Sequence, residues 1–229
     1  MGTVEGEKRL ALSFSTGEKG RTKDEVFYHD VFNILFLSLI SWYNIKFLSK
    51  VDLSAYGTEE LAYGVEEREL FSLVHMMMTT YFCIDLLYIW AVPQAVLSKQ
   101  STLIIHHLLS LLFLFFPAFH PQFSFHCSCV ISLEINSLFL TLRRNVSKDT
   151  FIYKVFDNMF LFTWITLRLI MLPVLLIMFV IFDYYRIVSF SNVIVNFGTL
   201  AILLQSCLIY MSFTWTFDLL RKHHFRTIL

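Results

Sequence analysis

Long apolar blocks alternate with short polar segments along most of the chain. The blocks lie at about residues 28–48, 70–92, 102–118, 122–142, 158–182 and 193–220. A helix that crosses a membrane needs about 17–25 mostly apolar residues. Within these blocks the apolar residues are nearly continuous rather than confined to one helical face, as they would be in a soluble protein. The pattern therefore predicts an all-α, polytopic membrane protein with about six transmembrane helices.

Two features of this pattern need separate interpretation. The first block contains His29, Asp30 and Asn44, which weaken it as a span. The third and fourth blocks are separated only by "PAFHPQ", residues 117–122. These two blocks could form a re-entrant hairpin, but each is long enough to cross a membrane alone. We therefore count them as two separate spans.

Lysine and arginine are distributed unevenly between the two sides that six spans would create. The side that holds both termini carries thirteen of them, against four on the opposite side. The thirteen are Lys8, Arg9, Lys19, Arg21, Lys23, Lys99, Arg143, Arg144, Lys148, Lys154, Arg221, Lys222 and Arg226. Because cytosolic loops carry the excess of positive residues, both termini are predicted to be cytosolic.

The composition supports one membrane domain with short ends. We expect a flexible cytosolic tail at residues 1–25, one transmembrane domain at 26–222 and a cytosolic C-terminal tail at 223–229. The chain is 56% hydrophobic, above the usual apolar share of soluble domains. Its formal net charge is zero, so no basic surface field argues for nucleic acid.

Ionisable residues interrupt several of the apolar blocks. Asp85, His106, His107 and Glu134 each lie roughly 7–12 Å inside the cytosolic end of a predicted span, given the rise of a helix. Arg168 lies nearer the midplane. Such residues cost a few kcal/mol each on insertion scales, so their default interpretation is functional. Their shared depth favours a common polar cavity over independent helix–helix contacts, which stay the alternative.

The last block carries its own polar face. Gln205, Ser212 and Thr216 are spaced by seven and four residues, close to whole helical turns. This face runs toward the cytosolic end and could join the same cavity. Pro173 is expected to bend the fifth helix and to expose backbone carbonyl groups near Arg168.

The histidine pair limits the chemistry of such a cavity. Adjacent residues are about 100° apart on a helix, so only one ring can point straight at the bundle axis while the other lies at its flank. A chelating pair prefers positions i and i+3 or i+4, so we predict no metal site at His106 and His107. A neutral imidazole oriented by Asp85 or Glu134 could act as a general base toward a hydroxyl or amine, or could bind a lipid headgroup. His120 and His126 are expected to be interfacial or solvated.

Five stretches in order resemble the TLC-domain family, which includes the ceramide synthases. They are "YFCIDLLYIW" around Asp85, "TLIIHHLLSLLFLF" with His106 and His107, "LEINSLFLTLRRN" from Leu133, "TWITLRLIMLP" with Arg168, and "LQSCLIYMSFTWTFDLLRK" with Trp215. The resemblance covers residues 30–222.

The resemblance implies a six-helix barrel around a lipid-sized tunnel, in the endoplasmic reticulum membrane. By position, His106 and His107 match the histidines that transfer an acyl group from acyl-CoA to a sphingoid base, with Asp85 as a third catalytic candidate. The candidate ligand-binding residues are Glu134, Asn136, Arg168, Gln205 and Ser212. No cofactor is expected beyond acyl-CoA as a co-substrate.

One segment departs from the ceramide synthases. Where they carry Asp-x-x-Asp, this chain has Glu134-Ile135-Asn136-Ser137, with one acid instead of two. The chain is thus nearer the other TLC proteins, which are linked to membrane lipid composition. We expect a protein that binds or processes lipid and contributes to lipid homeostasis. A ceramide-synthase-like N-acyltransferase is the alternative, and a cargo receptor or chaperone of the endoplasmic reticulum is a second one. Membrane lipid is the expected partner, with no nucleic acid, and homo- or hetero-oligomers stay open.

Overall fold

A computed structural model describes residues 4–51, 64–92, 100–119, 123–184 and 197–228. Over these residues the chain forms helices and no strand. The elements are α1 (Val4–Leu48), α2 (Val65–Ala91), α3 (Gln100–Phe119), α4 (Ser124–Ile131), α5 (Glu134–Arg144), α6 (Phe151–Thr163), the π-helix η4 (Trp164–Met171), α7 (Leu172–Met178), the π-helix η5 (Phe179–Tyr184) and α9 (Phe197–Ile228).

The predicted number of spans is confirmed, because the described residues contain six helices long and apolar enough to cross a membrane. They are Asp24–Leu48, Val65–Ala91, Gln100–Ala118, Ser124–Arg144, Phe151–Ile181 and Gly198–Arg221. The third and fourth are separate candidate spans, as expected. The fourth combines α4 and α5, and the fifth runs through α6, η4, α7 and η5.

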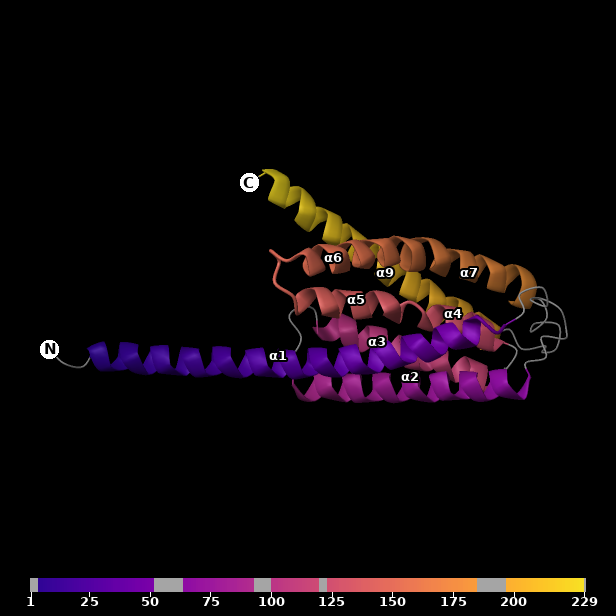
Figure 1. Ribbon diagram of the computed structural model, residues 1–229, viewed down its shortest axis with the longest axis horizontal. Helices are drawn as coiled ribbons and strands as arrows, with labels where there is room; N and C mark the ends of the chain where they lie inside the picture. Colours follow the sequence, from indigo (N-terminus) through magenta and orange to yellow (C-terminus); the bar gives the residue numbers. More distant parts are fainter. Residues whose placement is uncertain (1–3, 52–63, 93–99, 120–122, 185–196, 229) are drawn as a thin grey trace.

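Both ends of the chain leave the bundle at the same end, where α1 begins and α9 finishes (Figure 1). We call this the termini end. The α5–α6 turn also lies there, which agrees with an even number of crossings (Figure 1). That the termini end faces the cytosol stays a prediction, as does the flexibility of residues 1–25. The helix α1 extends well beyond the bundle at this end (Figure 1).

The helices close into a ring. The contacts run from α1 to α2, from α2 to α3, from α3 to α9, from α9 to the fifth span, from α6 to α5, and from α5 back to α1. The spatial order of the spans is therefore one, two, three, six, five, four. A closed ring leaves room along its axis, which side chains or a ligand must fill.

The short helix α4 fills the end of the ring opposite the termini. It contacts α1, α2, α3 and α7, which belong to four different spans. Ser124 and residues 126–131 are all buried. The chain then makes a turn at Ser132 and Leu133 before α5 begins at Glu134. The fourth span thus plugs one half of the ring with α4 and borders the other half with α5.

The plugged half pairs several of its polar groups internally, although Nδ1 of His126 is buried without a hydrogen-bond partner in the described part of the chain. Asn44 donates from Nδ2 to the carbonyl oxygen of Ser128 at 3.0 Å and to Oγ of Ser132 at 2.9 Å. His126 Nε2 lies 2.9 Å from Gln205 Oε1, and Gln205 Nε2 donates to the carbonyl oxygen of Leu172 at 3.1 Å. The prediction of an interfacial or solvated His126 is wrong, because its ring is 2% exposed and pairs with α9.

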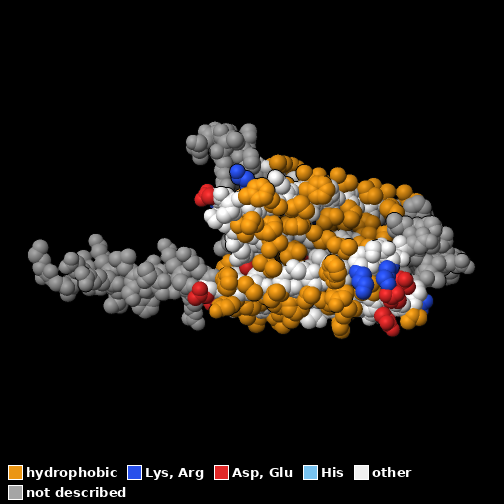
Figure 2. Space-filling view, viewed as in Figure 1, with side chains coloured by type: hydrophobic (Ala, Val, Ile, Leu, Met, Phe, Trp, Pro, Cys, Tyr) orange, Lys and Arg blue, Asp and Glu red, His pale blue; other side chains and the backbone are white. Residues whose placement is uncertain are grey.

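The outer surface of the ring is apolar. Exposed side chains include Leu35, Leu39, Trp42, Leu87, Leu112, Phe162, Ile177, Leu203 and Tyr210. In Figure 2 hydrophobic side chains cover the flank of the bundle, and the charged side chains gather near its ends. A surface of this kind is stable against lipid chains rather than water. The protein is therefore a multi-pass membrane protein.

The fifth span is irregular where Pro173 was expected to disturb it. The π-helix η4 ends at Met171, and Pro173 lies in the first turn of α7. Proline has no N–H to continue the backbone ladder, and single π-turns often occur at functional sites. The wider turn carries Arg168 and places it, buried, on the inner face of the ring.

Candidate functional site

A cavity of about 340 Å³ occupies the half of the ring nearer the termini end. This volume is within the range of small-molecule sites in proteins. Residues from every span line it. They are His29, Asn33, Leu37, Tyr81, Asp85, Ile89, Thr102, Leu103, His106, His107, Glu134, Asn136, Ser137, Leu140, Thr141, Arg143, Arg144, Phe160, Trp164, Arg168, Trp215, Asp218 and Leu219.

Asp85 is the first polar centre of the cavity. It lies on the inner face of α2, where residues 78, 81, 82, 85 and 89 are buried at helical spacing. Its Oδ1 lies 2.5 Å from Nε2 of His29 on α1, and its Oδ2 lies 2.6 Å from Nε2 of His107 on α3. A single carboxylate therefore connects three neighbouring helices.

This contact decides the tautomer of His107. An ionised carboxylate can only accept hydrogen bonds, so Nε2 of His107 carries the hydrogen that Asp85 binds. In neutral His107 the lone pair is then on Nδ1. That atom is buried, and no hydrogen-bond partner for it lies within the described part of the chain. His107 thus has one nitrogen oriented by a carboxylate, while the other is buried and unpaired in the described structure.

His106 has a separate acidic partner. Its Nε2 lies 3.8 Å from Oε1 of Glu134, a distance typical of an ion pair rather than a direct hydrogen bond. The side of its ring contacts Trp215 of α9, with ring centres 5.4 Å apart. The two histidine rings are 5.5 Å apart. His107 turns toward α2 and His106 toward α5 and α9, so both line the cavity from adjacent positions.

Arg168 is a buried cation of the same lining. Its Nε donates to Oδ1 of Asn136 at 3.1 Å, and its Nη2 donates to Oγ of Ser137 at 3.3 Å. The guanidinium lies 5.3 Å from the ring centre of Trp164 and 5.7 Å from that of Trp215. Cation–π contacts of this kind stabilise an arginine that has lost its water.

Asn136 is held from both sides. Its Nδ2 donates to the carbonyl oxygen of Phe160 at 2.9 Å and to Oγ1 of Thr163 at 3.0 Å. Its oxygen is thereby directed at Arg168. The amide therefore fixes the guanidinium by joining α5 to α6 and η4.

The structure brings together most of the residues singled out from the sequence. Asp85, His106, His107, Glu134, Asn136 and Arg168 all line the cavity. The polar face of α9 does not join them. Gln205 binds His126 in the plugged half, and Ser212 donates to the carbonyl oxygen of Leu208 on its own helix. No group of three His, Cys, Asp or Glu residues in the described ranges has an arrangement that could hold a metal ion.

Comparison with known proteins gives one match. The family model for the TLC domain matches residues 27–221, most of the chain. The chain belongs to the TLC-domain family. No curated protein and no solved structure gives a significant match to it.

The sequence interpretation missed three residues of this TLC-domain protein's cavity that come from the first two spans. His29 binds Asp85 directly, and Asn33 lies one helical turn along from it. Tyr81 donates its hydroxyl hydrogen to Oδ1 of Asn33 at 3.1 Å. A signal was present, because His29 and Asn33 have i, i+4 spacing within an apolar block. From the sequence, His29 is interpreted only as a residue that weakens the span, and Asn33 is not considered.

Proposed function

We propose that this TLC-domain protein processes membrane lipid by acyl transfer to a lipid hydroxyl or amine, and thereby contributes to lipid homeostasis. The endoplasmic reticulum membrane is the proposed location. One observation carries the proposal: His107, a residue of the cavity lining, is fixed through Nε2 by a buried carboxylate, while its Nδ1 is buried and unpaired in the described structure. A base oriented by a carboxylate is the arrangement that activates hydroxyl nucleophiles in acyl transfer.

The residues have defined roles in the proposed step. His107 Nδ1 takes the proton of the acceptor hydroxyl or amine as its oxygen or nitrogen attacks the acyl carbonyl carbon. Asp85 stabilises the imidazolium that results. The bond from the acyl carbon to the donor's leaving atom then breaks, and His107 returns the proton to that atom. If the donor is acyl-CoA, the leaving atom is the thiol sulfur.

Two further groups support this step. Arg168 is a desolvated cation in the same lining, suited to stabilising negative charge on the carbonyl oxygen. His29 donates to the second oxygen of Asp85 and keeps that carboxylate in place. A site with fixed groups needs little reorganisation when charge develops.

The test is a transfer assay with the purified protein in detergent or in microsomes. Labelled acyl-CoA is offered with a long-chain amine in one arm and with a lipid alcohol in the other. We expect transfer in one arm, and a loss of about 10²–10⁴-fold in His107→Ala, the usual contribution of a general base. Transfer to the amine would identify the narrower, ceramide-synthase-like N-acyltransferase.

A matched control is available at His75. This half-buried histidine contacts the carbonyl oxygen of Leu114 at 2.6 Å and is not part of the cavity lining. His75→Ala should therefore keep the activity. Absence of transfer to either acceptor by the wild-type protein, or full activity in His107→Ala, would reject the proposed reaction.

A further inference from the structure

A second pocket, of about 360 Å³, lies at the termini end of the bundle outside the central cavity. We call it the mouth pocket. Its lining comes from the start of the first span, the end of α5, the α5–α6 turn and the first turn of α6. The lining residues are Val26, Phe27, Asp30, Arg143, Arg144, Asn145, Val146, Lys148 and Tyr153.

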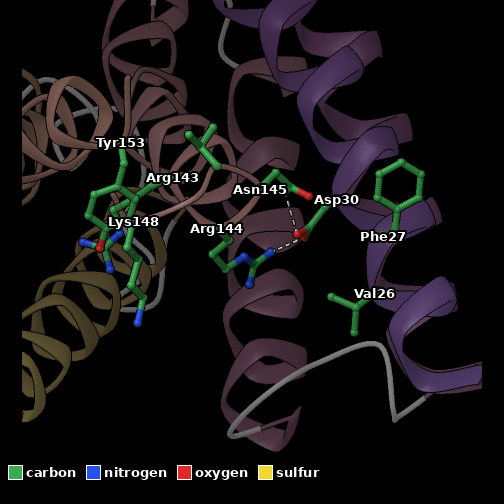
Figure 3. A pocket seen from close by; sticks show the side chains of 9 residues that line it. Val26, Phe27, Asp30, Arg143, Arg144, Asn145, Lys148 and Tyr153 are labelled. Atoms are coloured by element: carbon green, nitrogen blue, oxygen red, sulfur yellow. Dashed lines mark hydrogen bonds and ion pairs between the residues drawn. The ribbon is translucent and has the colours of Figure 1, made fainter. Parts of the chain in front are cut away.

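Positive charge dominates this lining. It contains Arg143, Arg144 and Lys148 against one acid, Asp30, and a second acid, Asp157, pairs with Arg143 from outside the lining. Figure 3 shows Asp30 on α1 facing Arg144 and Asn145, while Arg143 and Lys148 lie together near Tyr153. Three cations in one pocket at the end of a membrane span are the arrangement that attracts an anion from the lipid surface.

Among the described residues, Arg143 and Arg144 have fewer hydrogen-bond acceptors than donors. Arg144 Nη2 binds Oδ1 of Asp30, whose Oδ2 accepts from Asn145 Nδ2 at 2.8 Å. Arg143 Nη1 donates to Oδ1 of Asp157 at 2.6 Å. A guanidinium has five N–H donors in a planar fork, so each arginine retains donors for a second anion. The acids fix the direction of the two forks without occupying them fully.

The N-terminus of α6 adds to the positive electrostatic potential of the mouth pocket. Thr150 caps this helix by accepting from the backbone N–H of Tyr153 at 3.2 Å. The positive end of a helix dipole and a cluster of cations both favour phosphate groups. The apolar residues Val26, Phe27 and Val146 suit the carbon part of a ligand more than a free ion.

The mouth pocket also adjoins the central cavity. Arg143 and Arg144 belong to the lining of both. A ligand bound by these two arginines would lie next to both pockets. The two arginines thus form the boundary between a charged entrance and the interior.

We propose that the mouth pocket binds the phosphate group of a ligand whose acyl part enters the central cavity. The proposal deepens the proposed function, on which the role of the inner cavity rests, by naming a phosphate-bearing substrate. Arg143 and Lys148 bind the phosphate oxygens together with the remaining donors of Arg144. The phosphate can belong to a membrane lipid or to a soluble ester, and the test separates these sources.

The test measures ligand binding by native mass spectrometry of the full chain in detergent, so it does not depend on catalysis. Phosphatidic acid, diacylglycerol with the same chains, and glycerol 3-phosphate are compared. We expect phosphatidic acid to bind at least about tenfold more tightly than diacylglycerol, which lacks the phosphate. Tight binding of glycerol 3-phosphate would also support the phosphate site and would indicate a soluble ligand.

The variant of choice is Arg143→Gln with Lys148→Gln. It leaves intact the pair between Arg144 and the buried Asp30, and the released carboxylate of Asp157 is partly exposed, so folding should be preserved. We expect phosphatidic acid binding to fall about tenfold or more, and binding of diacylglycerol, which has no phosphate to lose, to fall far less. Lys154→Gln is the matched control, since Lys154 is exposed on α6 outside both pockets.

The outcomes separate this proposal from the proposed reaction. Equal binding of phosphatidic acid and diacylglycerol, together with no binding of glycerol 3-phosphate, would overturn the phosphate site even if acyl transfer were found. Equal loss in the double variant and in Lys154→Gln would also overturn it, because the effect would then be a general loss of surface charge. Phosphate-dependent binding without any acyl transfer would support the site and reject only the reaction.

Discussion

The two halves of the helical ring differ in how they fill the space along its axis. In the half opposite the termini, α4 enters the ring, Asn44 donates to Ser128, and Gln205 joins His126 to the carbonyl oxygen of Leu172. In the half nearer the termini, α5 forms part of the ring itself, and charged side chains surround a cavity. The same six spans therefore build a packed core at one end and a polar chamber at the other.

This difference teaches where the protein can bind a ligand. Neutral hydrogen-bonded pairs in a membrane join helices at modest gain. Acids and imidazoles in a cavity cost more to bury, and such residues usually mark function. The turn at Ser132 and Leu133 separates the packed half from the cavity. It allows the fourth span to fill the ring with α4 and then to line the cavity with α5.

The largest expected effect concerns the charged half. Asp85→Asn replaces the carboxylate that faces Nε2 of His29 and Nε2 of His107 with a neutral amide, so the imidazolium formed during transfer loses its stabilising negative charge. By analogy with the aspartate of a serine-protease triad, we expect acyl transfer to fall by about 10³–10⁴-fold. The transfer assay measures this, with the unfolding midpoint as a check of folding. A variant that retained wild-type turnover would show that Asp85 does not orient the base.

The same kind of change in the packed half should affect stability and not chemistry. Gln205→Leu removes the acceptor of His126 and the donor to Leu172. We expect a loss of about 1–3 kcal/mol, because buried polar atoms are left unpaired. Thermal unfolding in detergent gives the stability, and turnover below the midpoint should stay at the wild-type level. A large loss of turnover in folded protein would mean that the plug contributes to the site.

Larger side chains should have different effects in the two halves of the ring. Ser128→Val places extra carbon in a fully buried position of α4 and should destabilise by about 1–3 kcal/mol, the usual cost of overpacking. Leu140→Phe adds volume to the cavity lining and should leave stability unchanged while weakening ligand binding. Unfolding midpoints and lipid binding of the two variants measure the contrast. If Leu140→Phe lowered the unfolding midpoint and Ser128→Val weakened lipid binding instead, the ligand would bind in the half that contains α4.

The smallest effect is expected outside both halves. Lys50 and Glu66 form an exposed ion pair between the ends of α1 and α2. Exposed ion pairs contribute little to the free energy of unfolding, because water and salt screen the charges. Glu66→Gln should therefore shift neither the unfolding midpoint nor lipid binding beyond measurement error. A clear shift in either would show that this end of the bundle is coupled to the rest.

Much of the site could be predicted because the membrane makes polar residues conspicuous. Asp85, His106, His107, Glu134 and Arg168 stood out in apolar blocks, and each lines the cavity. His29 did not stand out as a site residue, because it lies near the start of its block. Sequence gives the depth of a residue along a helix but does not say which neighbour its helix will meet.

The sequence by itself determined the class of the protein, its six spans and the depth of its buried charges, because hydrophobicity and helical rise act locally along the chain. Only the tertiary structure decided the circular order of the helices. That order places Asp85 between His29 and His107, and it leaves Gln205 with His126 at the other end. The physical reason is that a helix face selects its partner by packing against residues far away in the chain, and no local pattern records that choice.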